Sequence, residues 1–240
     1  MAFRSAATTA HGSTDWTANA PSGVTAGDRE IALVSQDNAG ATVTFPSGFG
    51  TPQSADLSGP DSQTVWVAER VVAGGDSYAF TSSTSNSGVT HILAFSGRHA
   101  STASTFGTAT QNTSSNPSPI SASCNGVTAA NGDDVALVLG IDITSSGATA
   151  SWSTPPTNYT QRSASSSSLG CALTCSRDNV SAGATGALTG TITLSAGNAG
   201  YGGYAIAIPA SGGGASPALD DSGAFPGFEA QSNPLVISVW

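Results

Sequence analysis

The sequence predicts an all-β chain of two tandem, related β-sandwich or jelly-roll-like units, with a C-terminal strand extension and almost no helix. First, the chain repeats itself: Gly23-Val24-Thr25-Ala26 and the apolar run 31–34 return as Gly126-Val127-Thr128-Ala129 and the apolar run 135–138. Second, short apolar runs alternate with turns rich in Gly, Asn and Asp. Third, no stretch combines the helical period with capping residues.

The first unit is expected to span residues 21–99, after a polar N-terminal lead-in at residues 1–20. Its strands are predicted from β-branched and aromatic runs between turns. They are Glu30–Ser35, Ala41–Phe45, Thr64–Val72, Ser77–Thr81 and Thr90–Ser96. Aromatic side chains are expected to fill its core, namely Phe45, Trp66, Tyr78 and Phe95.

The second unit is expected at residues 120–210, after a Ser/Thr/Asn/Pro-rich linker at residues 100–119. Its core is expected to contain Trp152, Leu173, Tyr204 and Ile206. The runs 31–34 and 135–139 are apolar on both strand faces, which predicts central strands covered on both sides. The predicted strands are Ser121–Cys124, Asp133–Ile141, Thr149–Trp152, Gly170–Ser176, Gly186–Leu194 and Gly203–Ile208.

The C-terminal extension, residues 211–240, lies outside the repeat and begins with a Gly-rich break. Its end is strongly β-forming, so we expect it to serve assembly or anchoring. It either folds back onto its own sheet or docks as an added strand on a neighbouring subunit. The residues expected to anchor it are Phe225, Phe228, Leu235, Val236, Ile237, Val239 and Trp240.

Charge and hydropathy narrow the possible partners. The six basic residues are all Arg and are scattered, and the net charge is −9, so no basic patch for nucleic acid is expected. No apolar run approaches the roughly 20 residues that span a bilayer, so no membrane partner is expected. The N-terminal residues lack the apolar segment of a signal peptide, so we expect none.

We expect no enzyme, cofactor or metal, because the sequence contains no HExxH, P-loop, nucleophile elbow or CxxC pattern. Asp28 and Asp133 recur in the two halves and are predicted to be turn residues. Arg70 and Arg177 also occupy matching positions, each at the end of a predicted strand. We expect a structural role for both, stacking on an aromatic ring or bridging to loop carbonyls, with a catalytic role as the alternative.

The cysteines are predicted to be free, buried thiols. Cys171 and Cys175 lie on one face of a predicted strand, about 13 Å apart, whereas a disulfide needs Cα atoms within about 7 Å. Cys124 could pair with one of them only from an adjacent strand. His91 alternates with apolar neighbours and is predicted to lie in a core or an interface.

Two further kinds of site remain open. A calcium site is an alternative use of the loops near Asp37 and Asp142. A carbohydrate site would need exposed aromatic rings near loops, for which Trp16, Tyr159 and Tyr201 are the candidates.

The repeated motifs also resemble a known module. Pro21-Ser22-Gly23-Val24-Thr25-Ala26-Gly27-Asp28, an apolar strand and then Phe45-Pro46-Ser47-Gly48-Phe49 are similar to a module common in tailed-bacteriophage virion proteins. The second half resembles it through residues 156–159, Arg177 and residues 181–186, so the resemblance covers about residues 15–210. The chain departs from the module by having Phe49 and Tyr159 where Trp is usual.

The resemblance implies a bacteriophage virion structural protein, such as a capsid decoration (cement) or head-fibre protein. The alternative is a minor tail protein or a receptor- or carbohydrate-binding adhesin, and an enzyme such as a depolymerase ranks below both. The expected partners are further copies of the chain (a homo-oligomer, for instance a trimer), the major capsid protein or tail proteins, and a host-surface glycan. The expected location is the virion, assembled in the host cytoplasm.

Overall fold

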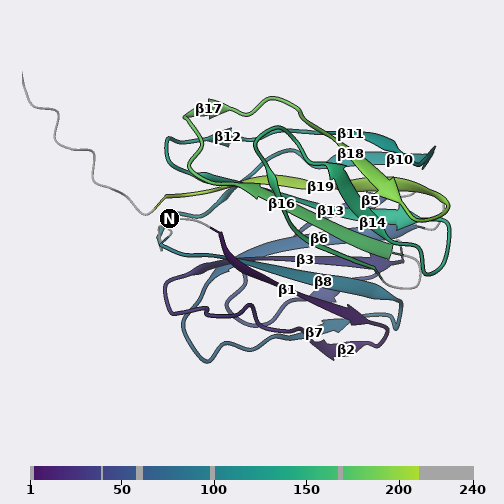
Figure 1. The fold of residues 1–240 in the computed structure, drawn as a ribbon. Coiled ribbons are helices and arrows are strands. Elements are labelled where there is room, and N and C mark those ends of the chain that lie inside the picture. The colour runs from purple at the N-terminus through teal and green to yellow at the C-terminus, as the bar shows by residue number, and fades with distance from the viewer. Residues whose placement is uncertain (1–2, 39, 58–61, 98–100, 167–169, 211–240) are drawn as a thin grey trace, which may run out of the picture.

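The computed structural model describes residues 3–38, 40–57, 62–97, 101–166 and 170–210. These residues form nineteen β-strands in antiparallel sheets (Figure 1). No helix occurs among them, and so none that is long and apolar enough to cross a membrane. The predicted all-β class is confirmed.

The first unit contains two antiparallel sheets. Its strands are β1 (Phe3–His11), β2 (Asp15–Thr17), β3 (Arg29–Asp37), β4 (Val43–Thr44), β5 (Gln53–Leu57), β6 (Gln63–Val71), β7 (Ala79–Ser82) and β8 (Gly88–Phe95). The larger sheet has the order β1-β8-β3-β6-β5, and the smaller sheet has the order β2-β7-β4.

The second unit repeats this arrangement. Its strands are β9 (Thr105–Phe106), β10 (Thr110–Pro117), β11 (Ile120–Cys124), β12 (Thr128–Ala129), β13 (Asp134–Ile143), β14 (Ala150–Thr154), β15 (Thr160–Ser166), β16 (Gly170–Arg177), β17 (Gly183–Ala184), β18 (Leu188–Leu194) and β19 (Asn198–Ile208). The larger sheet has the order β10-β19-β13-β16-β15, and the smaller has the order β11-β18-β14. The larger and smaller sheets of the two units have the same strand order when β1 is matched with β10 and β3 with β13, which relates the two tandem units. The second unit adds β9 and the two-stranded sheet β12-β17.

Each unit packs its smaller sheet on its larger one around an outer core. The first outer core contains Trp16, Val34, Trp66, Phe80 and Ile92, with Phe45, Phe49 and Tyr78 partly buried against it. The second outer core contains Leu137, Leu139, Trp152, Leu173 and Ile192, and also all three cysteines. Two sheets closing on one apolar layer make a sandwich, as the alternating sequence pattern predicts.

The two larger sheets also pack on each other, which gives four layers with the smaller sheets outermost (Figure 1). β3 contacts β13, β8 contacts β16, and β1 contacts β15 across this interface. The central core between the larger sheets includes Ile31, Leu33 and Val67 of the first unit and Val138 and Ile206 of the second. β3 and β13 are therefore covered on both faces, as their continuous apolar runs predict.

Three expected core residues lie elsewhere than in their own unit's core. Phe95, Tyr204 and Ile206 contribute to the central core, because successive residues of a strand covered on both faces point to opposite layers. The Tyr204 hydroxyl donates a hydrogen bond to the Ser54 carbonyl of the other unit, at 2.6 Å. These side chains therefore join the two units.

The segments expected as a lead-in and a linker contain strands. β1 pairs with β8 along the edge of the first larger sheet, and β2 belongs to the first smaller sheet. β9 and β10 both pair with β19 within residues 100–119. β1, β2 and β10 are therefore edge strands, and β9 is a short strand added to the second larger sheet. The expected anchoring residues of the C-terminal extension lie outside the described residues, so their role stays a prediction.

Candidate functional site

The same turn precedes the central strand of each unit and is built around one carboxylate. Asp28 accepts a hydrogen bond from the Thr25 backbone N–H, at 2.8 Å, and Asp133 accepts one from Ala130 N–H, at 2.7 Å. The Asp28 carbonyl accepts from Val72 N–H, and the Asp133 carbonyl accepts from Val180 N–H. The two aspartates are thus equivalent turn residues, and Val72 is equivalent to Val180.

Arg70, at the end of β6, is fully enclosed. Its Nε donates to the Glu30 carboxylate at 2.7 Å, and both side chains have no exposed surface. Its guanidinium lies 4.4 Å from the ring centre of Phe49 and 4.5 Å from that of Tyr78. Its Nη1 donates to the Ser77 carbonyl at 2.9 Å. This contact set matches the structural role expected for Arg70.

Tyr78 closes the Arg70 site from the outside. Its hydroxyl donates to the second carboxylate oxygen of Glu30, at 2.8 Å. Burial, followed by the hydrogen bond to Glu30 and its negative charge, raises the pKa of Tyr78 to about 12. The phenol therefore stays protonated at neutral pH, and the Glu30 carboxylate lies between an arginine and a hydroxyl donor.

The equivalent position in the second unit lacks both of these partners. Arg177 stands opposite Val135 in the β13–β16 ladder, as Arg70 stands opposite Glu30 in the β3–β6 ladder. A valine thus replaces the carboxylate.

The closing tyrosine is also absent from the second unit. Ser82 pairs with Val43 in the first smaller sheet, and Leu194 pairs with Ala150 in the second. The fourth residue before Ser82 is Tyr78, and the fourth before Leu194 is a glycine, Gly190.

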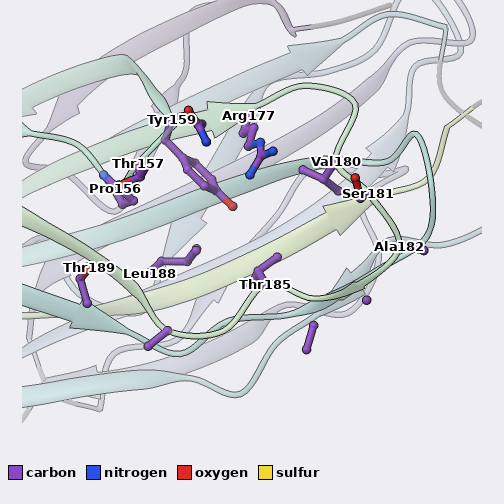
Figure 2. A pocket seen from close by; sticks show the side chains of 14 residues that line it. Pro156, Thr157, Tyr159, Arg177, Val180, Ser181, Ala182, Thr185, Leu188 and Thr189 are labelled. Atoms are coloured by element: carbon purple, nitrogen blue, oxygen red, sulfur yellow. The ribbon is translucent and has the colours of Figure 1, made fainter.

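The chain around Arg177 forms a pocket of about 440 Å³ (Figure 2). Residues 181–189, which contain β17 and the first two residues of β18, form one wall, and the turn at residues 156–159 forms another. This segment is longer than residues 73–77 of the first unit. Figure 2 shows the Tyr159 ring and the Arg177 guanidinium pointing into the same space, with Thr185 and Leu188 below them. A pocket of this size lies within the range that small ligands occupy.

The turn that carries Tyr159 matches the turn that carries Phe49. Tyr159 N–H donates to the Pro156 carbonyl at 2.8 Å, and Phe49 N–H donates to the Pro46 carbonyl at 3.4 Å. The residue before each aromatic has a positive φ, 68° at Asn158 and 93° for the glycine of the first unit. Asn and Gly are the residues that tolerate this conformation.

Arg177 is the charged residue of the pocket lining, and it has no carboxylate partner. Its half-buried side chain makes no hydrogen bond or ion pair with any other residue that the structure describes. The Tyr159 hydroxyl likewise has no described partner. Burial, with a smaller contribution from Cys175, raises the pKa of Tyr159 to about 12, although Arg177 acts in the opposite direction. The hydroxyl is therefore a hydrogen-bond donor at neutral pH.

The first unit has a hollow beside the segment that contains Asp76 and Tyr78, lined on its other side by residues that include Gly23 and Val24. Its volume is about 300 Å³, and its lining includes Asp76 and Tyr78 but no arginine. Arg70 is hidden beneath Tyr78, whereas Arg177 reaches its pocket. The expected structural role of Arg177 stays a prediction, because the contacts that support it for Arg70 are absent here.

The other candidate residues lie apart from this pocket. Trp16 and Tyr201 are buried, and only Tyr159 of the three aromatic candidates for a carbohydrate site lines a pocket. The cysteines are free and buried, as predicted, and burial raises their pKa values. No cluster of three or more His, Cys, Asp or Glu residues that could hold a metal occurs among the described residues.

His91 lies at the interface between the units, as predicted. Its ring Nε2 shares a hydrogen bond with Ser165 of β15, and its Nδ1 has no partner among the described residues. Burial lowers the pKa of His91 to about 3, and burial also lowers the pKa of His11, which is stacked on Trp16, to about 4. Both rings are neutral at pH 7.

Acid is therefore expected to destabilise the fold through His91. A histidine with a lowered folded pKa contributes stability that is complete above its unfolded pKa of about 6.5 and is lost as the pH falls toward the folded value. We expect a loss of order 3 kcal/mol between pH 7 and pH 4 from His91. Urea unfolding at both pH values should show a smaller loss for His91→Met. An unchanged loss in that variant would contradict this assignment, and His11→Gln measures the share of His11.

Comparisons with protein-family models, with curated proteins and with solved structures gave no match. The class of protein is therefore defined by the fold and the pocket alone. The chain is a tandem β-sandwich protein with a central core shared between its two units.

Proposed function

We propose that the chain is a non-catalytic structural protein of a tailed-bacteriophage virion, namely a capsid decoration or head-fibre protein. The observation that supports this best is that the motif carrying the resemblance forms an equivalent turn twice. Gly27-Asp28 with Val72, and Gly132-Asp133 with Val180, make the same hydrogen bonds. The resemblance thus rests on residues that build a repeated structural module.

A protein inventory of purified particles tests this proposal. Capsids and tails would be separated, and the chain would be quantified in each fraction by mass spectrometry. We expect the chain in the capsid fraction, in a fixed ratio to the major capsid protein. Recovery in the tail fraction would favour the minor tail alternative, and absence from both fractions would refute a virion role.

The C-terminal residues are the proposed anchor to the particle or to further copies of the chain. Deleting residues 232–240, which include Leu235, Ile237 and Trp240, is expected to abolish attachment to particles. Attachment would be measured by co-sedimentation of the purified protein with particles that lack it. The thermal unfolding midpoint serves as the control for folding. Normal occupancy by the truncated protein would exclude this anchoring role.

The alternative function, a receptor- or carbohydrate-binding adhesin, is favoured by one observation. The second unit has a pocket lined by Tyr159 and Arg177 at the position that Tyr78 and Glu30 close in the first unit. A structural module and a binding pocket are compatible in one chain, because each unit can keep its cores while a loop varies.

A further inference from the structure

We propose that the Arg177 pocket of the second unit binds the carboxylate of an acidic sugar residue, of the hexuronic acid class. The site rests on its own geometry and does not depend on where the protein resides. The first unit shows how the protein itself neutralises an arginine at this position. There the equivalent arginine is neutralised by Glu30, at 2.7 Å, and the same carboxylate accepts a hydrogen bond from Tyr78.

The charge of Arg177 calls for an anion. A half-buried guanidinium with no described protein partner keeps its donors available to an anion, and the attraction is stronger where part of the surrounding water is excluded. Arg presents a planar set of donors that matches a carboxylate. The Tyr159 hydroxyl points into the same space and can donate to the second oxygen, as Tyr78 does in the first unit (Figure 2).

The rest of the lining favours a hydroxylated ligand. Threonine and serine residues contribute to the pocket lining, and the aliphatic lining consists of Pro156, Val180, Leu188 and three alanines. The Tyr159 ring supplies the aromatic surface on which a sugar ring can pack. The polar lining residues are Thr157, Asn158, Ser181, Thr185 and Thr189.

The electrostatics favour one carboxylate over a more highly charged group. Arg177 is the only charged residue among those that line the pocket, and the chain carries a net charge of −9. A strongly anionic chain repels polyanions, so binding depends on a local cation that balances a single negative charge. A phosphate dianion would leave one charge uncompensated.

Titration of the full chain with methyl glucuronoside tests the proposal, with binding followed by protein NMR. Methyl glucoside, acetate and inorganic phosphate are the comparison probes. We expect saturable binding of the glucuronoside and at least about tenfold weaker binding of each of the others. Equal binding of the glucoside would refute the carboxylate contact, equal binding of acetate would refute the sugar, and tighter binding of phosphate would refute the charge argument. No binding of the glucuronoside would refute the site.

Variants locate the interaction. Arg177→Gln is expected to weaken glucuronoside binding by at least about tenfold, and Tyr159→Phe by a smaller factor. Arg177 has no described partner, so its replacement should leave the thermal unfolding midpoint unchanged. Arg4→Gln is the matched control: it removes the same charge, in the first unit, where Arg4 pairs with Asp28 at 2.9 Å. Unchanged binding in Arg177→Gln, or an equal loss in Arg4→Gln, would overturn the assignment.

Discussion

Replacing Arg70 by Met is expected to lower the free energy of unfolding by about 3–5 kcal/mol, which is the cost of leaving a buried charge without its partner. The Glu30 carboxylate has no exposed surface, and Arg70 is its only cationic partner among the described residues. The variant would retain only the Tyr78 hydroxyl as a donor to that carboxylate. Urea unfolding monitored by tryptophan fluorescence at pH 7 measures the loss.

Two matched variants separate the charge effect from simple packing. Arg177→Met makes the same change at the equivalent position, where Val135 has replaced the carboxylate, and should cost less than about 1 kcal/mol. Combining Arg70→Met with Glu30→Val removes both charges and should cost less than Arg70→Met alone. Equal losses at Arg70 and Arg177 would mean that the ion pair is not what distinguishes the two units.

The sequence alone could match Arg70 with Arg177, but not predict that their surroundings differ. That difference appears only when the two units are aligned in structural register. Equivalence of Asp28 and Asp133 places Glu30 against Val135 and Ile31 against Ala136. Matching the apolar runs 31–34 and 135–138 directly is therefore wrong by one residue. A strand apolar on both faces gives no alternation to fix its register, so the sequence does not reveal that Arg177 lacks the carboxylate partner of Arg70.

The strands that the sequence predicts are those with apolar side chains, because burial leaves a compositional pattern. β3, β6, β8, β13 and β16 are of this kind. The sequence does not predict the edge strands β1, β5, β10 and β15, since their polar side chains resemble a loop. Edge strands are held by backbone hydrogen bonds to a single neighbouring strand. The side-chain composition does not reveal these bonds.

Separating the two units is expected to prevent either from folding as a soluble monomer. Residues 3–97 alone would expose the central-core face of their larger sheet, and residues 101–210 alone would expose the opposing face. Apolar surfaces of this extent rarely remain exposed on soluble monomers. Each fragment should aggregate or remain unfolded when expressed alone, and co-expression should restore a soluble one-to-one pair, as measured by gel filtration and circular dichroism. A folded monomeric fragment would show that the outer cores suffice.

A single glycine provides a test that keeps the chain intact. Gly140 lies on β13, and a Cβ placed there would come 2.4 Å from Val65 Cγ2 and 2.7 Å from Ser35 Oγ, both across the central interface. Gly140→Val should therefore force the larger sheets apart and cost about 1–3 kcal/mol or more. Gly12→Val, at a position with no atom within 4 Å of the added Cβ, is the matched control. Because the Gly140 contacts come from the other unit, a loss confined to this variant would trace the cost to the packing between the units.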